Sequence, residues 1–164
     1  MDFIWSPWRM EYITSPKPSQ EKCIFCAALE ENNDRETLIV YRGRLAFAIL
    51  NRYPYTNGHL MVVPYEHQPS FEILNQEIRI DLMELMTQAV QVLTKVYSPG
   101  GFNVGANIGA VAGAGVTGHI HFHVLPRWGG DTNFMTTLSG TRVLPETLEE
   151  TFRRVSQTWK EMFP

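Results

Sequence analysis

The stretch VTGHIHFHVLPRW, residues 116–128, decides the fold because it joins a strand pattern to side chains that carry chemistry. Three of the chain's five histidines stand in it at alternating positions, as His119, His121 and His123. Apolar residues fill the places between and after them, as Ile120, Phe122 and Val124. Side chains two apart on a strand share a face. We therefore predict a strand over 119–125, with its apolar face on the core and its histidine face on a polar site.

The rest of the chain alternates short apolar runs with two amphipathic patterns. We expect a short helix over 24–30, strands over 37–41, 44–51, 59–63 and 102–108, and a final helix from Pro145. A long helix lies between the third and fourth strands, with an apolar stripe of Leu82, Met86, Ala89, Leu93 and Val96. The order β-β-β-α-β-β-α predicts an α+β fold with an antiparallel sheet.

Composition bounds the class of protein. The chain has 164 residues, 44% of them hydrophobic and 19% charged, which suits a single globular domain over 1–164. Within it we distinguish an extension (1–22), a core (23–127) and a C-terminal segment with its helix (128–164). A net charge of -3 provides no basic face for duplex nucleic acid. No apolar run is typical of a signal peptide or membrane span, so we expect a cytoplasmic protein.

Three interpretations of the histidine row are open from the residues alone. The histidines could be solvated on an outer sheet face, could chelate zinc directly as in a metallohydrolase, or could include a nucleophile. A neutral imidazole can attack phosphorus because histidine titrates near neutrality. Metal-dependent hydrolysis usually needs a carboxylate base, and residues 102–130 contain no Asp or Glu. This absence favours the nucleophile.

Two further motifs flank this chemistry. The run GAVAGAGVTG, residues 109–118, has four glycines in ten residues and leads into the histidine row. Its backbone could approach a ligand closely and present N–H groups to phosphate, or it could be a plain surface loop or bulge. The chain's two cysteines, Cys23 and Cys26, form a C-x-x-C pair. In a reducing compartment this pair indicates metal binding or redox chemistry rather than a structural disulfide.

The motif HIHFHVL, residues 119–125, resembles the signature of the histidine triad (HIT) family of nucleotidyl hydrolases and transferases. LNRYPYTNGHLMVVP (50–64) and CIFC (23–26) are similar to other family segments. WSPWRMEYI (5–13) and PRWGGDTNFM (126–135) resemble one subgroup, the bacterial diadenosine tetraphosphate phosphorylases. The resemblance implies a HIT-like fold with a five-stranded antiparallel sheet and two main helices, joined edge to edge in a homodimer.

The resemblance also implies an activity, namely cleavage of dinucleoside polyphosphates, with diadenosine tetraphosphate as the expected substrate. His121 would attack the α-phosphorus and form a nucleotidyl-histidine, which phosphate or water then discharges. His123 would contact the phosphate, while His119 and His59 complete the polar cluster. A backbone carbonyl or neighbouring ring would have to keep the other nitrogen of His121 protonated.

The family pattern assigns nucleotide-binding positions as well. They would be Asn51, Asn107, Gly113, Gly115 and Thr117, with Phe47 and Leu50 walling the base pocket. The sequence departs from the family at Gly115, where a Gln or Ser usually helps to protonate the leaving group. This departure leaves the choice between phosphate and water open, and it admits a nucleotide-binding sensor with little turnover as an alternative.

The resemblance gives the cysteines a role too. Cys23 and Cys26, with His67 and His119, would hold a structural zinc ion in a closed Cys2His2 arrangement. No metal would be required for the transfer chemistry itself. The expected partners are a small nucleotide and a second copy of the chain, without nucleic acid or membrane.

Overall fold

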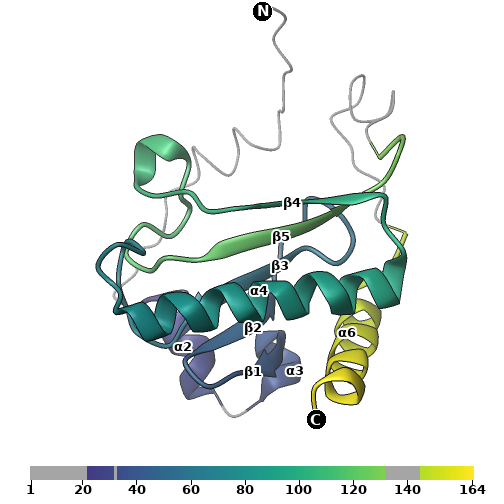
Figure 1. The fold of residues 1–164 in the computed structure, drawn as a ribbon, viewed down its shortest axis with the longest axis horizontal. Helices are drawn as coiled ribbons and strands as arrows, with labels where there is room; N and C mark the ends of the chain where they lie inside the picture. Colours follow the sequence, from purple (N-terminus) through teal and green to yellow (C-terminus); the bar gives the residue numbers. More distant parts are fainter. Residues whose placement is uncertain (1–21, 32, 132–144) are drawn as a thin grey trace, which may run out of the picture.

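The computed structural model describes residues 22–31, 33–131 and 145–164 (Figure 1). The opening motif at 5–13, nearly all of the extension at 1–22 and residues 132–135 of the PRWGGDTNFM motif lie outside the described residues. The described chain carries five strands, two long helices, two short helices and one 3-10 turn. None of these helices is both long and apolar enough to span a bilayer.

One antiparallel sheet forms the centre of the molecule. Its strands are β1 (Ile39–Arg42), β2 (Ala46–Leu50), β3 (Leu60–Pro64), β4 (Gly101–Gly105) and β5 (Phe122–Arg127). They lie in the order β1-β2-β3-β5-β4, and all neighbouring pairs are antiparallel. The prediction of an α+β fold with a five-stranded antiparallel sheet is therefore confirmed.

The strand register divides the sheet residues between two faces. Leu50 pairs with Leu60, and Leu60 pairs with Val124, so these three side chains form one row. Ile49, Met61 and His123 form the adjacent row in the same way. Adjacent rows point to opposite faces because side chains alternate along each strand. The row of Leu50, Leu60 and Val124 therefore lies on one side of the sheet, and the row that contains His123 lies on the other.

Two long helices pack together and against the sheet (Figure 1). Helix α4 (Gln76–Tyr97) begins where the Asn75 side chain accepts a hydrogen bond from the Ile78 N–H, and it ends at Ser98 in the left-handed conformation. Its predicted stripe is buried at Leu82, Met86, Ala89 and Leu93, and half-buried at Val96. Helix α6 (Leu148–Met162) buries Trp159, whose ring stacks on Tyr41 at 5.1 Å between centroids.

Several predicted boundaries were wrong. Helix α6 begins at Leu148 rather than Pro145, because the Thr147 side chain caps the Glu150 N–H. Helix α2 (Ile24–Glu30) matches its prediction, but the helical turn α3 (Asp34–Thr37) was not predicted. This turn ends in a left-handed residue, Leu38, which delays β1 to Ile39.

The segment between the last two strands also differs from the prediction. Strand β4 stops at Gly105 rather than at residue 108, and the glycine-rich run contains the 3-10 turn η1 (Ala110–Ala112). Gly109 and Gly113 flank this turn, both with positive φ. Strand β5 begins at Phe122 rather than at residue 119, so His119 and His121 precede it.

Candidate active site and metal centre

The three histidines of the row lie at the entrance to β5, and they are not solvated. The exposed fraction is 0% for His119 and 5% for His121, and His123 is half-buried. The alternative of a solvated histidine face is therefore wrong. The row also divides between two clusters. The ring of His119 faces His67, whereas the ring of His121 packs at 5.1 Å from that of His123.

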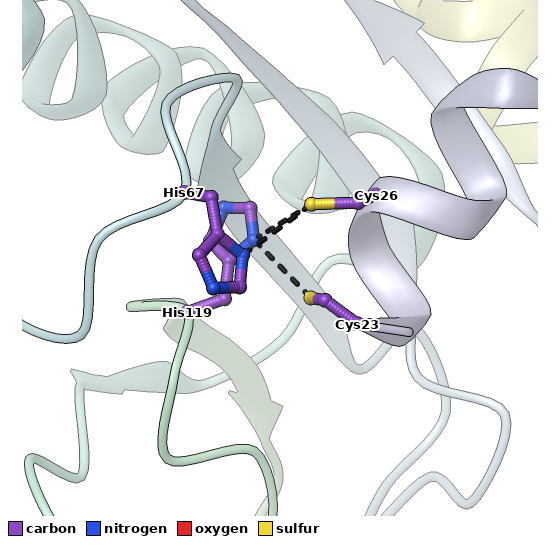
Figure 2. Close-up of side chains that lie close together, drawn as sticks. All are labelled: Cys23, Cys26, His67 and His119. Carbon is purple, nitrogen blue, oxygen red and sulfur yellow. Dashed lines mark hydrogen bonds between the residues drawn. The ribbon is translucent and has the colours of Figure 1, made fainter. Parts of the chain in front are cut away.

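The first cluster joins His119 to His67, to Cys23 directly before α2 and to Cys26 within α2, as Figure 2 shows. The Nδ1 atom of His119 lies 3.4 Å from the Cys23 sulfur and 3.7 Å from the Cys26 sulfur. The Nδ1 atom of His67 lies 3.4 Å from the Cys26 sulfur. All four ligand atoms lie within 4.8 Å of one another, so these residues could hold a single metal ion.

The spacing of these atoms suits a tetrahedral ion. Zinc–sulfur and zinc–nitrogen bonds of usual length, at tetrahedral angles, place sulfur and nitrogen about 3.6 Å apart. The other nitrogen of His119, Nε2, lies 2.9 Å from the carbonyl oxygen of Pro64. A carbonyl only accepts, so Nε2 carries the proton and Nδ1 offers its lone pair to the cluster. His119 is thus in the tautomer that a metal ligand needs.

His121 has the opposite arrangement. Its Nδ1–H donates to the carbonyl oxygen of His119 at 2.9 Å. The proton is held on Nδ1, and the lone pair of the neutral ring is therefore on Nε2. The Phe25 ring packs 5.1 Å from the His121 ring. A buried imidazole with its lone pair directed by a backbone carbonyl can act as a nucleophile at neutral pH.

His123 belongs to a second chain of hydrogen bonds. The backbone N–H of Tyr55 donates to Nδ1 of His59 at 3.2 Å. The proton of a neutral His59 ring is then on Nε2, which lies 2.9 Å from Nδ1 of His123. His123 accepts this bond, so its own proton is on Nε2. The backbone amide of Tyr55 thereby sets the tautomers of two rings and makes His123 a donor suited to a phosphate oxygen.

Burial keeps these rings neutral. Burial lowers the pKa of His121, although its hydrogen bond to the His119 carbonyl opposes this. Burial and the neighbouring His121 lower the pKa of His123 to about 4. Desolvation disfavours the charged imidazolium in each case. Both rings are therefore neutral at neutral pH, each with a single ring proton, which is the state that the tautomer assignments require.

Apart from the two residues of strand β2, the predicted nucleotide-binding residues lie on two loops, one after β2 and one between β4 and β5. Asn51 precedes the 52–59 turn and accepts a hydrogen bond from the Tyr53 N–H. Asn107 donates to the carbonyl of Gly113 at 3.4 Å across the glycine-rich run. Gly115 and Thr117 are exposed in the same run. These residues lie on loops, where a ligand could reach them.

The two residues predicted to wall a base pocket are covered instead. Phe47 and Leu50 have exposed fractions of 0% and 2% in strand β2. The register also places Leu50 in the row with Val124, on the sheet face opposite His123. Neither side chain offers open surface to a ligand in this structure. Phe47, two positions from Ile49, lies on the same face as His123, and the base pocket walled by Phe47 and Leu50 stays a prediction.

Backbone groups fix the histidine tautomers. For His121 the sequence analysis expected a backbone carbonyl or a ring, and the structure identifies it as the carbonyl of His119. The Tyr55 N–H and the Pro64 carbonyl were not predicted, because no side-chain pattern indicates them. Phe25 could have been noticed, because it stands between the two cysteines. A surface hollow of about 550 Å³ lies elsewhere, lined by Arg35 and by residues around α6, and it contains none of the histidines.

The fold and the histidine clusters define a histidine triad protein, and the comparisons agree. A family model described as the HIT domain matches residues 32–130. The chain belongs to this family. It is 40% identical over 162 residues to a protein of Mycobacterium tuberculosis named AP-4-A phosphorylase. The alignment covers 95% of this chain and 83% of the relative. The resemblance predicted from the motifs is confirmed.

Two further matches place the chain more broadly. A Schizosaccharomyces pombe protein named bis(5'-nucleosyl)-tetraphosphatase [asymmetrical] is 34% identical over 89 residues, 54% of this chain and 48% of the relative. A crystal structure titled as a zinc-bound histidine triad family protein from Mycobacterium smegmatis superposes with a TM-score of 0.70. That match covers 88% of this chain and 97% of the other at 24% identity, and it establishes the shared fold.

Proposed function

We propose that this protein cleaves dinucleoside polyphosphates, with diadenosine tetraphosphate as the main substrate, through a nucleotidyl-histidine on His121. The two named relatives carry names that refer to tetraphosphates bridging two nucleosides. The single observation that carries the proposal is the hydrogen bond from Nδ1–H of His121 to the His119 carbonyl. It leaves the Nε2 lone pair of a buried, neutral ring free for attack.

The proposed reaction has two steps. Nε2 of His121 forms a bond to the α-phosphorus, and the bond from that phosphorus to the bridging oxygen breaks, releasing ATP. Phosphate or water then attacks the same phosphorus, the P–N bond breaks, and ADP or AMP leaves. His123 donates its Nε2–H to a phosphoryl oxygen and stabilises the charge that develops there. His59 holds His123 in that tautomer.

The glycine-rich run is a suitable place for the phosphates. Backbone N–H groups 112–114 donate to carbonyls inside the run, whereas those of 115–118 have no backbone acceptor among the described residues. These groups stand directly before His119 and can bind phosphoryl oxygens. Gly115 brings no side chain to assist the leaving group. We propose phosphate as the preferred acceptor, because the chain resembles the phosphorylase over nearly its whole length.

A zinc ion fits the Cys23–Cys26–His67–His119 cluster. The donor set is two thiols and two imidazoles, their spacing is tetrahedral, and the protonated nitrogen of His119 is bonded to a carbonyl. Bound there, zinc would cross-link α2, the loop after β3 and the entrance to β5. His119 belongs to this cluster, so direct zinc chelation by all three histidines of the row is disfavoured.

The sheet edge at β4 suits a homodimer. Strand β4 is the last in the strand order, and Val104 on it is half exposed. Unpaired edge strands are usually covered by a partner or blunted. We propose that two copies pair along β4. Val104→Lys should shift the mass measured by light scattering from dimer to monomer, and an unchanged dimer would contradict this arrangement.

The decisive experiment traps the covalent intermediate. Protein is mixed with radiolabelled diadenosine tetraphosphate without phosphate, quenched in alkali, and digested for peptide mapping, which should place the label on His121. With phosphate present, the products should be ADP and ATP rather than AMP and ATP. His121→Asn should bind AMP but form no adduct and no product. Turnover by His121→Asn would refute the proposal, and tight AMP binding without any turnover by the parent would favour a sensor.

A further inference from the structure

One peptide unit lies between the metal-ligand cluster and the proposed nucleophile, and both of its polar groups are hydrogen-bonded. Its carbonyl, on His119, accepts from Nδ1–H of His121 at 2.9 Å. Its N–H, on Ile120, donates to the Gln68 carbonyl at 2.7 Å. The C=O and N–H of a trans peptide are coplanar and point in opposite directions. The bond to Gln68 therefore sets the direction of the carbonyl that holds His121.

Each side of this peptide is attached to a member of the cluster. On one side, the ring of His119 places Nδ1 among the cysteines and donates through Nε2–H to the Pro64 carbonyl. On the other side, Gln68 directly follows His67, whose Nδ1 lies 3.4 Å from the Cys26 sulfur. His67 is exposed and sits on a loop between β3 and α4. In the described contacts, its side chain is held mainly by the cluster itself.

We propose that the Cys23–Cys26–His67–His119 cluster, when it holds a metal ion, positions the nucleophile by clamping the peptide between His119 and Ile120. Gln68, through its backbone carbonyl, and His119 are the positioning residues. The clamp keeps Nδ1–H of His121 on the His119 carbonyl and so directs the Nε2 lone pair outward. This inference rests on the proposed role of His121, and it gives the metal a task beyond stabilising the fold.

Loss of the metal should then have a particular kinetic form. Without the ion, the loop bearing His67 and Gln68 is free to shift, and the peptide can rotate. The groups proposed to bind phosphate, His123 and the run 115–118, are not part of the clamp. Substrate binding should therefore change little, while His121 loses its single tautomer. A loss in kcat with KM nearly unchanged is the expected signature.

The test compares His67→Ala with Glu66→Ala, both loaded with Zn²⁺ and then dialysed against metal-free buffer. Glu66 is exposed on the same loop directly before His67, and in the described residues its carboxylate accepts a hydrogen bond only from the Gln68 side chain, so Glu66→Ala is the matched control. Metal content is measured by emission spectrometry, and the core by intrinsic tryptophan fluorescence, to which buried Trp159 contributes. The His121 tautomer is measured by 15N NMR without substrate. His67→Ala should lose metal, show mixed His121 tautomers, and lose kcat by about tenfold or more with KM within about threefold. Glu66→Ala should match the parent in all measurements.

The outcomes separate the clamp from a purely structural metal. A folded, metal-free His67→Ala with parental kcat and an unaltered His121 spectrum would overturn the proposal. If His67→Ala loses its core fluorescence, His67→Cys decides, because three thiolates and His119 retain a metal while the shorter side chain draws the loop inward. His67→Cys should bind metal and stay folded, yet show an altered His121 spectrum and a lower kcat. Parental values for both would equally overturn the clamp.

The same measurements distinguish this inference from the proposed function. The NMR readout needs no substrate, so it reports on the clamp whether or not the chain cleaves dinucleoside polyphosphates. If trapping finds no adduct on His121 but the tautomer still follows the metal, the proposed function fails and the positioning stands. If the adduct forms while the tautomer ignores the metal, the clamp fails alone.

Discussion

The Nε2 atom of His59 lies 2.9 Å from Nδ1 of His123, although 64 positions separate the two residues in the chain. Strand pairing brings them together, since His59 directly precedes β3 and His123 lies in β5 beside Met61. The Tyr55 N–H fixes the proton on His59, and His59 fixes the proton on His123. The backbone amide of Tyr55 thus determines, through the His59 ring, which nitrogen of His123 carries the proton.

Replacing His59 tests this transmission. His59→Ala removes the donor to Nδ1 of His123, so His123 can adopt the other tautomer and lose its Nε2–H toward phosphate. We expect kcat to fall by about 10- to 100-fold, with KM less affected. His59→Gln keeps an amide donor at a similar reach and should recover part of the loss. Steady-state kinetics with diadenosine tetraphosphate check this, and equal kcat for both variants would argue against a donor role.

The lowered pKa of His123 predicts how stability depends on pH. Burial and His121 lower its pKa to about 4 in the folded protein, against about 6.5 in an unfolded chain. Between these values the unfolded chain binds a proton that the folded one does not. Above about pH 6.5 the proton binding of His123 should therefore not reduce the unfolding free energy. As the pH falls from there toward 4, the unfolding free energy should decline.

Urea unfolding at a series of pH values measures this decline. The parent should lose stability more steeply between about pH 6.5 and pH 4 than His123→Gln, which has no titrating ring at this position. The neighbouring rings of His59 and His121 are present in both proteins, so the difference between the two slopes isolates His123. Identical slopes would show that His123 is not held neutral in the folded state.

The sequence predicted the sheet well because its evidence was local. Apolar runs separated by Gly43 and by the Asn57–Gly58 turn indicated the first three strands, and the structure places strands there. The family signature indicated the nucleophile's ring and its need for a backbone or ring partner. Which carbonyl would supply that partner could not be predicted, because the partner arises from chain folding rather than from spacing.

The sequence failed where a local pattern was overridden by tertiary hydrogen bonds. The alternation of the histidines indicated a strand from residue 119, but the Ile120 N–H donates to Gln68 and the His119 carbonyl accepts from His121. These groups are then unavailable to a sheet ladder, and β5 begins only at Phe122. For Leu50 the sequence left the strand register open, and the register places its side chain on the face opposite His123.

Gly58 offers a test of the turn that delivers His59. It has φ +72°, and a Cβ there would lie 2.8 Å from Cε2 of Tyr97 and 3.0 Å from Cδ2 of Leu93. Gly58→Ala combines backbone strain with a clash against α4, so we expect a loss of about 1–3 kcal/mol in unfolding free energy. At Gly101 a Cβ meets nothing within 4 Å, and Gly101→Ala is the control. Similar unfolding midpoints for the two variants would contradict this account.

The last prediction concerns the attachment of α6. The Glu146 carboxylate, just before that helix, accepts hydrogen bonds from Thr151 at 2.7 Å, from Arg154 at 2.6 Å and from the Tyr97 hydroxyl of α4. Arg154 also donates to the Val96 carbonyl at 2.7 Å. Glu146→Gln removes the charge and one acceptor oxygen, which leaves Arg154 poorly compensated. We expect a loss of about 1–3 kcal/mol in unfolding free energy.

An exposed carboxylate on the same helix provides the comparison. Glu149 pairs with Arg35, and the side chains of both are more than half exposed. Glu149→Gln should change the unfolding free energy by less than about 1 kcal/mol, because solvent screens exposed ion pairs. Urea unfolding of the two variants, in the same buffer, measures the difference. If Glu149→Gln costs as much as Glu146→Gln, charge on α6 rather than the buried network attaches the helix.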